Sequence, residues 1–202
     1  MRCLCVVIGY CCGCFLTAEV VARYKAGKSA CKMGSGNPGM ANIGALFGKK
    51  WAAVTLLGDV SKTILPCLMC QSVLFPQIGR VAILYAGLGA MLGHGFPIWN
   101  KFRGGKGVAV FCTYLFLFSP AAGGTAGLVG LCAVAVTKYL AVGALVIPVS
   151  VLFPVIRDWD MESGFVFLAG AAVLFFLHRD SIKRIVHRTE KKTDLIRKWK
   201  KI

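Results

Sequence analysis

The sequence predicts an all-α integral membrane protein with about seven transmembrane helices, and three observations support this fold class. Of the 202 residues, 57% are hydrophobic and only 16% are charged, whereas ordinary soluble domains carry about 25% charged residues. The mean hydropathy is correspondingly high, at +0.70. The apolar residues are gathered into long runs, and most basic residues fall in the polar breaks between those runs. This arrangement is typical of a multi-pass membrane protein.

The apolar runs define the expected spans in chain order. A helix crosses a hydrocarbon core about 30 Å thick with about 20 residues, so runs near that length with few charges qualify. We expect spans at Cys3 to Ala22, Trp51 to Cys70, Val81 to Trp99, Val108 to Pro120, Ala121 to Val136, Leu140 to Ile156 and Gly164 to Leu177. The fourth and fifth spans are short, and only the break from Ser119 to Gly124 separates them. Counts of six or eight spans therefore stay open.

The lysines and arginines predict the orientation of these spans, because cytoplasmic loops of membrane proteins carry an excess of both. With the N-terminus outside, the inside segments hold most of the 24 basic residues. Those segments are the loops after the first and third spans, Lys138, and a basic tail at about 178–202. The acidic residues Asp158, Asp160 and Glu162 fall in a loop expected outside. We therefore expect an odd number of spans and a cytoplasmic C-terminus.

Composition also excludes other classes of protein. The net charge is +16, but the bases are not gathered on one folded polar surface, so no nucleic-acid partner is expected. Of the ten cysteines only Cys31 lies in a polar loop, which predicts buried thiols rather than disulfides. Cys67 and Cys70 lack a second ligand pair, so no metal site is expected. No repeat or second domain is apparent, and residues 1–202 are expected to form one multi-pass domain.

The first polar segment with chemical character follows the first span. It contains Gly34, Ser35, Gly36, Asn37, Gly39 and Asn42. The glycines match GxGxxG, but no strand precedes them, so a dinucleotide fold is rejected. Glycines let backbone N–H groups approach an anion, and the serine and asparagines add side-chain donors. We expect an anion-binding loop, and the alternative is a flexible loop with a helix N-cap.

The second polar segment, before the fourth span, contains Gly104, Gly105, Lys106 and Gly107. A Walker A loop needs Ser or Thr after its lysine, and Gly107 stands there, so a P-loop is rejected. Three glycines around one lysine instead present an ammonium from an open backbone, which suits a phosphate or a carboxylate. The alternative is simple anchoring by positive charge, which explains the lysine but not the glycines.

The third polar segment begins where the seventh span ends, with His178, Ser181 and Glu190. An imidazole at the membrane surface can hydrogen-bond an anion or move a proton, and the alternative is a structural histidine. The end of the basic tail, from Leu195 to Lys201, is expected to lie against anionic headgroups.

One pair of charged residues falls inside an expected span. Asp59 and Lys62 stand three residues apart in the second span, so they can pair on one helix face. Ionisable groups within a membrane usually face the bundle interior or water. A polar cavity wall is favoured over proton transport, because no chain of acids crosses the other spans.

Together these segments resemble the motifs of the PlsY family of bacterial membrane acyltransferases, over nearly the whole chain. The first family motif is similar to Gly34 through Asn42, with Gly48 to Lys50, Leu57, Asp59 and Lys62 continuing the match. The second is similar to Gly93-His94, Phe96-Pro97 and Phe102 to Ala109, and the third to His178-Arg179, Ile182, Arg184 and Glu190. The resemblance implies transfer of a fatty acyl group from acyl-phosphate to the 1-hydroxyl of sn-glycerol-3-phosphate. The products would be lysophosphatidic acid and phosphate, in the first acylation step of phospholipid synthesis.

The resemblance also leads to an expected set of site residues and partners. The expected catalytic residues are Ser35, Lys106 and His178. The expected substrate-binding residues are Gly34, Gly36, Asn37, Gly39, Asn42, Gly104, Gly105, Gly107, Ser181 and Glu190. Acyl-phosphate, glycerol-3-phosphate and membrane lipids are the expected partners, without a metal or cofactor, and the assembly is taken as a monomer. The expected location is the bacterial cytoplasmic membrane, with the site facing the cytoplasm.

The chain departs from the family pattern at several positions. Ala41 and Ala45 stand where Thr and Arg are usual, Ala141 and Ala144 where paired serines are usual, and Ser181 where Asn is usual. Charge-assisted ligands of this kind contribute about 1 to 3 kcal/mol each. Two alternatives therefore stay open: an acyltransferase with another acceptor, and a non-enzymatic membrane protein that binds lipids or anions.

Overall fold

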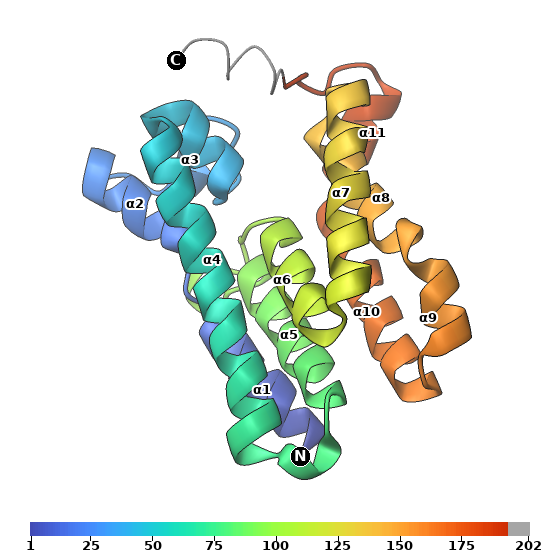
Figure 1. The fold of residues 1–202 in the computed structure, drawn as a ribbon. Coiled ribbons are helices and arrows are strands. Elements are labelled where there is room, and N and C mark those ends of the chain that lie inside the picture. Colours follow the sequence, from blue (N-terminus) through green and yellow to red (C-terminus); the bar gives the residue numbers. More distant parts are fainter. Residues whose placement is uncertain (194–202) are drawn as a thin grey trace.

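The computed structural model describes residues 1–193, and the regular elements in that range are helices (Figure 1). The helices are α1 (Arg2–Gly13), α2 (Thr17–Ala26), α3 (Met40–Phe47), α4 (Lys49–Met69), α5 (Val81–Gly95), α6 (Val108–Phe118), α7 (Pro120–Thr137), α8 (Leu140–Ser150), α9 (Leu152–Asp158), α10 (Met161–Leu177) and α11 (Arg179–Val186). Short turns of other helix types occupy Ala30–Lys32, Cys70–Leu74, Pro76–Ile78 and Ile98–Asn100. The last part of the expected basic tail, residues 194–202, lies outside the described residues.

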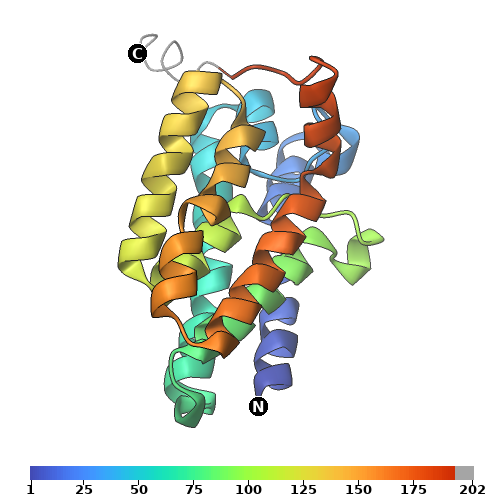
Figure 2. The ribbon, with the colours of Figure 1, turned by 90° about the vertical axis from the view of Figure 1, so that its right-hand side faces the viewer.

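The long helices run beside one another along one axis of the molecule. Figures 1 and 2 show the N-terminus at one end of this bundle and α11 at the opposite end. Within residues 1–193, five segments are long and apolar enough to cross a membrane, and α10 with α11 makes a sixth if that bent pair counts as one span. The chain is therefore a helical membrane protein, as its composition predicts.

The observed helices match some expected spans closely and divide others. The second and fifth expected spans correspond to α4 and α7, whose bounds differ from the expected ones by at most two residues at each end. The first expected span is divided into α1 and α2, and the sixth into α8 and α9. The fourth corresponds to α6, which is apolar but has only 11 residues.

The break between α6 and α7 is shorter than its sequence suggests. The Ser119 side chain accepts a hydrogen bond from the Ala122 N–H, at 3.4 Å, and so caps the N-terminus of α7. Pro120 takes the first helical position, where its missing N–H leaves no hydrogen bond unmade. The two glycines that follow continue the helix rather than interrupt it. One capping serine therefore separates the fourth and fifth expected spans.

α1 packs closely against α5 because both helices carry glycines at the interface. A Cβ on Gly9 would lie 2.0 Å from the Ala86 carbonyl oxygen. On the other helix, a Cβ on Gly89 would lie 2.1 Å from the Val6 carbonyl oxygen. Small residues four apart let two backbones approach within van der Waals contact, which is how helices associate in lipid. The end of α5, which leads into the polar segment before α6, is thereby held against α1.

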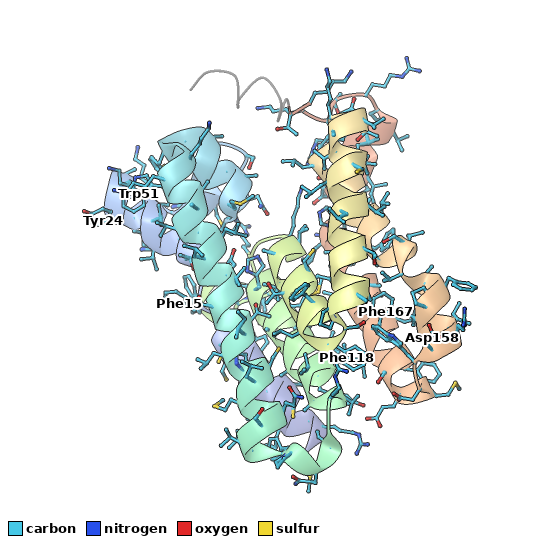
Figure 3. The ribbon with its side chains drawn as sticks, in the orientation of Figure 1. Phe15, Tyr24, Trp51, Phe118, Asp158 and Phe167 are labelled. Atoms are coloured by element: carbon cyan, nitrogen blue, oxygen red, sulfur yellow. The ribbon has the colours of Figure 1, made fainter. Side chains whose placement is uncertain are left out.

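Aromatic side chains fill the space between α6 and α10 at the end nearer the N-terminus. Figure 3 shows Phe118 and Phe167 close together there. The Trp159 ring lies between them, with centroids 4.5 Å from Phe118 and 5.6 Å from Phe167. Large apolar side chains elsewhere point outwards, including Leu57, Leu128 and Ile156. Such a surface suits contact with lipid tails rather than water.

Candidate active site

The three polar segments lie in the half of the molecule opposite the N-terminus. The glycine-rich loop is residues 33–39, before α3, and the lysine loop is residues 101–107, before α6. The third segment is the bend between α10 and α11. Figure 2 shows these blue, green and red segments in the same half of the molecule. The lysine loop contacts both other segments, because Lys106 bonds to Ser181 and Gly105 lies against Pro38.

The glycine-rich loop is held by its own hydrogen bonds. The buried Asn42 side chain accepts from the Ser35 N–H at 2.9 Å and donates to the carbonyl oxygens of Ala30 and Met33. The Gly36 N–H donates to Met33. Asn42 therefore shapes the loop from inside instead of offering its amide to a ligand. This differs from the sequence-based expectation, because the packing of α3 under the loop uses both ends of that amide.

The loop's backbone donors are also largely used. The N–H groups of Ser35, Gly36 and Gly39 bond within the segment. Gly34 has φ +58°, and a Cβ there would lie 2.2 Å from the Asn42 Oδ1 atom. The exposed Ser35 hydroxyl and the half-buried Asn37 amide remain on the outer side. An anion at this loop would meet these side chains rather than the cradle of amides that the glycines suggest.

The lysine loop packs against the glycine-rich loop. Gly105 donates its N–H to the His94 carbonyl oxygen at 3.0 Å. A Cβ on Gly105 would lie 2.1 Å from His94 Nε2 and 3.0 Å from the Pro38 carbonyl oxygen. Gly104 is equally confined, since its Cβ would lie 1.9 Å from the same His94 oxygen. These glycines are therefore required by close packing of the lysine loop against the end of α5 and, at Gly105, against the glycine-rich loop as well.

Lys106 joins the lysine loop to the third segment. Its Nζ atom donates to the Ser181 hydroxyl at 2.5 Å, and Arg184 donates to the same oxygen at 2.9 Å. Arg184 also forms an ion pair with Glu190, with 2.5 Å between Nε and Oε2. Two cations thus converge on one small hydroxyl, and the Glu190 carboxylate pairs with one of them. This cluster can neutralise a phosphate that approaches Ser181.

His178 lies beside this cluster at the bend after α10. Its Nδ1 atom is 2.8 Å from the Leu174 carbonyl oxygen, and the residue is 1% exposed. A carbonyl oxygen only accepts, so Nδ1 carries a proton and the neutral ring keeps an acceptor lone pair on Nε2. A neutral His178 can therefore accept a hydrogen bond from a substrate hydroxyl.

Burial lowers the pKa of Lys106 below its ordinary 10.5, and the nearby Arg184 lowers it further, while Glu190 and Asp180 oppose the shift. The charged form is consequently lost at a lower pH than in a free lysine.

We expect Lys106→Arg to change the pH profile of the acyl transfer that the sequence predicts. If turnover needs a cation at position 106, wild-type kcat/KM falls as pH rises through the lowered lysine pKa. Arginine stays protonated, with a pKa above about 12, so the alkaline fall should disappear from the measurable range. Rates at constant ionic strength between neutral and alkaline pH measure this. Identical alkaline limbs in the two proteins would contradict the assignment of the limb to Lys106.

Asp59 and Lys62 of α4 form a buried group with His94 of α5. Lys62 Nζ lies 2.8 Å from Asp59 Oδ1 and 2.8 Å from His94 Nδ1. It also donates to the Phe15 carbonyl oxygen at 2.7 Å. Phe15 lies beside the middle of α4 in Figure 3. The expected Asp59–Lys62 pairing is confirmed, and these residues lie in packed protein, where the ammonium has three partners.

Lys62→Met should lower stability strongly, because it leaves the Asp59 carboxylate buried without its counter-ion. Removing one partner of a buried pair costs about 3–5 kcal/mol. Thermal unfolding in detergent measures the loss. The double variant Asp59→Asn/Lys62→Met should recover much of it, since no isolated charge remains. A single variant as stable as wild type would show that the ion pair contributes little.

A separate apolar pocket opens at the break between α1 and α2. Its volume is about 450 Å³, and Phe15, Leu16, Glu19 and Trp99 are among the lining residues. Glu19 turns one carboxylate oxygen towards Ser29 and the Cys31 N–H, at 2.9 and 3.2 Å. This pocket does not include the Lys106 cluster. Those hydrogen bonds join the pocket wall to residues that precede the glycine-rich loop.

Arg184 and His94 complete the geometry but were absent from the expected set of site residues. Arg184 follows Ser181 by three residues on α11, so helical spacing places both on one face. That spacing is a usable sequence signal for Arg184. His94 is a lone histidine at the end of an apolar helix, and its sequence gives no sign of the lysine that it meets from α4.

The fold and this site define a class of protein: a helical membrane protein with a cationic, hydroxyl-bearing cluster at one end of its bundle. The family model for glycerol-3-phosphate acyltransferases matches residues 3–188. The chain belongs to this family.

Individual relatives agree with that assignment. The chain is 38% identical over 190 residues to "Glycerol-3-phosphate acyltransferase 1" of Lactobacillus johnsonii, covering 94% of this chain and 91% of the relative. It is 37% identical over 161 residues to a Francisella tularensis enzyme, covering 79% and 77% of the two chains. Among solved structures, the glycerol 3-phosphate form of PlsY (YgiH), an integral membrane glycerol 3-phosphate acyltransferase, aligns with a TM-score of 0.86 at 25% identity. That alignment covers 97% of each chain.

Proposed function

We propose that this chain transfers a fatty acyl group from acyl-phosphate to the 1-hydroxyl of sn-glycerol-3-phosphate. The products are 1-acyl-glycerol-3-phosphate and phosphate. The observation that carries the proposal is the convergence of Lys106, Arg184 and Ser181 beside His178. Family membership supports the acceptor. The PlsY structures described as glycerol 3-phosphate and lysophosphatidic acid forms support a fold that holds such an acceptor and such a product.

The reaction needs positioning and charge neutralisation more than it needs a strong base, because acyl-phosphate is already activated. Ser35 and Asn37 hold the donor phosphate, and Lys106 neutralises phosphate charge. Nε2 of His178 accepts a hydrogen bond from the 1-hydroxyl and orients it. The hydroxyl oxygen attacks the acyl carbon, the bond from that carbon to the phosphate oxygen breaks, and the departing phosphate takes the hydroxyl proton. No covalent enzyme intermediate forms.

The same proposal includes an orientation in the membrane. The chain crosses the bilayer seven times when the short α6 counts as a crossing, with the N-terminus outside. The site then faces the cytoplasm of a bacterial cell, where glycerol-3-phosphate is available. Basic residues near the site, including Lys101, Arg103 and Lys138, support this orientation. All the groups assigned to the site come from one chain, so a monomer suffices.

The test combines purified protein, palmitoyl-phosphate and labelled glycerol-3-phosphate. We expect lysophosphatidic acid and phosphate in equal amounts. Phosphate release without that product would point to another acceptor, which the alanines at positions 41 and 45 make a specific alternative. Protein that is folded but consumes no acyl-phosphate would instead be a lipid or anion binder.

A further inference from the structure

The buried ion pair of Asp59 and Lys62 determines which ring nitrogen of neutral His94 carries the proton. An ammonium only donates, so His94 Nδ1, at 2.8 Å, accepts from Lys62. Asp59 Oδ1 lies 3.6 Å from the same nitrogen, which is too long for a hydrogen bond to set the tautomer. The proton of the neutral ring therefore lies on Nε2.

The Nε2 atom of His94 lies where the lysine loop packs against the glycine-rich loop. A Cβ at position 105 would lie 2.1 Å from Nε2, so the ring fills the volume that a side chain on Gly105 would take. The Pro38 carbonyl oxygen closes the same volume from the glycine-rich loop, 3.0 Å from the same Cβ position. The imidazole thus packs directly against the residue that precedes Lys106.

We infer that Asp59, Lys62 and His94 act together as a positioning device for Lys106. α4 supplies the ion pair, the ion pair orients the imidazole, and the imidazole sets the path of Gly105. This inference rests on the proposed role of Lys106 in turnover. His94 acts through the loop and does not need to touch substrate.

Two variants separate the two ends of the His94 ring. His94→Gln keeps a side chain long enough to place an amide against Gly105, where Nε2 lies. His94→Asn keeps only an acceptor for Lys62, where Nδ1 lies. If the contact with Gly105 positions Lys106, Gln should stay within about tenfold of the wild-type kcat/KM. Asn should fall by about 100-fold, the scale of a misplacement of about 1 Å. If His94 serves only to accept the hydrogen bond from Lys62, His94→Asn should be more active than His94→Gln.

The pH at which kcat/KM falls on the alkaline side is a second measurement. This pH does not change when part of the protein is simply unfolded. The charged or titratable groups around Lys106 are Glu190, Arg184, Asp180 and His178, and neither variant changes them. A loosened loop lets water reach Lys106 and relieves the burial that lowers its pKa. The limb should therefore move to higher pH in His94→Asn. A smaller active fraction would lower the whole profile and leave the limb in place.

Thr63→Val is the matched control. Thr63 is buried on α4 and donates to the Asp59 carbonyl oxygen at 2.8 Å, within the same helix. Its loss removes a buried hydrogen bond, and the alkaline limb should stay at its wild-type position. The full-length protein is used in detergent, and rates are normalised to the folded fraction from size-exclusion chromatography. Equal activities for Gln and Asn, or an unmoved limb in Asn, would overturn the inference. An active Lys106→Ala would overturn the role of Lys106 separately.

Discussion

Replacing Lys106 with alanine should lower kcat/KM by about 1000-fold while the protein stays folded in detergent. The ammonium bonds to Ser181 and lies near Arg184, where it neutralises the phosphate charge of the proposed reaction. Removing one preorganised donor from a transition state costs about 100- to 1000-fold in rate. We expect the upper end of that range, because the donor is also a charge and is partly shielded from water.

The control for this variant is Lys183→Ala, which removes the same charge from an exposed position on α11. Its activity should remain close to wild type. Steady-state rates with acyl-phosphate and glycerol-3-phosphate compare the two variants. Near-normal turnover by Lys106→Ala would remove this residue from the mechanism, whereas equal losses in both variants would indicate a general effect of surface charge.

Replacing His178 with alanine should lower kcat/KM by about 100-fold or more, the scale of the loss when a reacting group is no longer held in position. The ring is held by the bond from Nδ1 to the Leu174 carbonyl oxygen, so its Nε2 atom has a fixed direction. His178→Asn offers a sharper comparison. Its amide can keep the bond to Leu174, but it has no group at the Nε2 position.

We therefore expect Asn to be as inactive as Ala at position 178, although more stable to heat. His187→Ala, at an exposed histidine just after α11, should retain activity. Full activity in His178→Asn would mean that the histidine serves only to hold the end of α10. Thermal unfolding and steady-state kinetics on the same preparations distinguish these results.

The sequence predicts the class of fold well because lipid imposes simple requirements on it. Long apolar runs must become helices, since no water is present to satisfy open backbone groups. The helix divisions near Gly13 and Val151 fall inside continuous apolar runs, so a hydropathy pattern does not place them. The short α6 has a local cause instead, because Ser119 caps the next helix and separates it from α6.

The site is predicted in part. Glycines around Lys106 indicate an open backbone, and the structure explains them by contact with His94 and the glycine-rich loop. The sequence could not decide the role of Asn42. An asparagine that binds an anion and one that hydrogen-bonds a loop from inside have the same sequence pattern. Lys62 and His94 are 32 positions apart in the sequence, and their contact at 2.8 Å depends on how α4 and α5 pack.

The glycine contact between α1 and α5 has a consequence for biogenesis. α1 is made first, but its partner surface at Gly89 and Gly93 is synthesised only after α4 has been completed. Until then, the backbone grooves of α1 face lipid or the insertion machinery. The N-terminal helix therefore enters the bilayer before α5 exists. A nascent chain arrested before residue 81 lacks the glycine surface of α5 against which α1 packs.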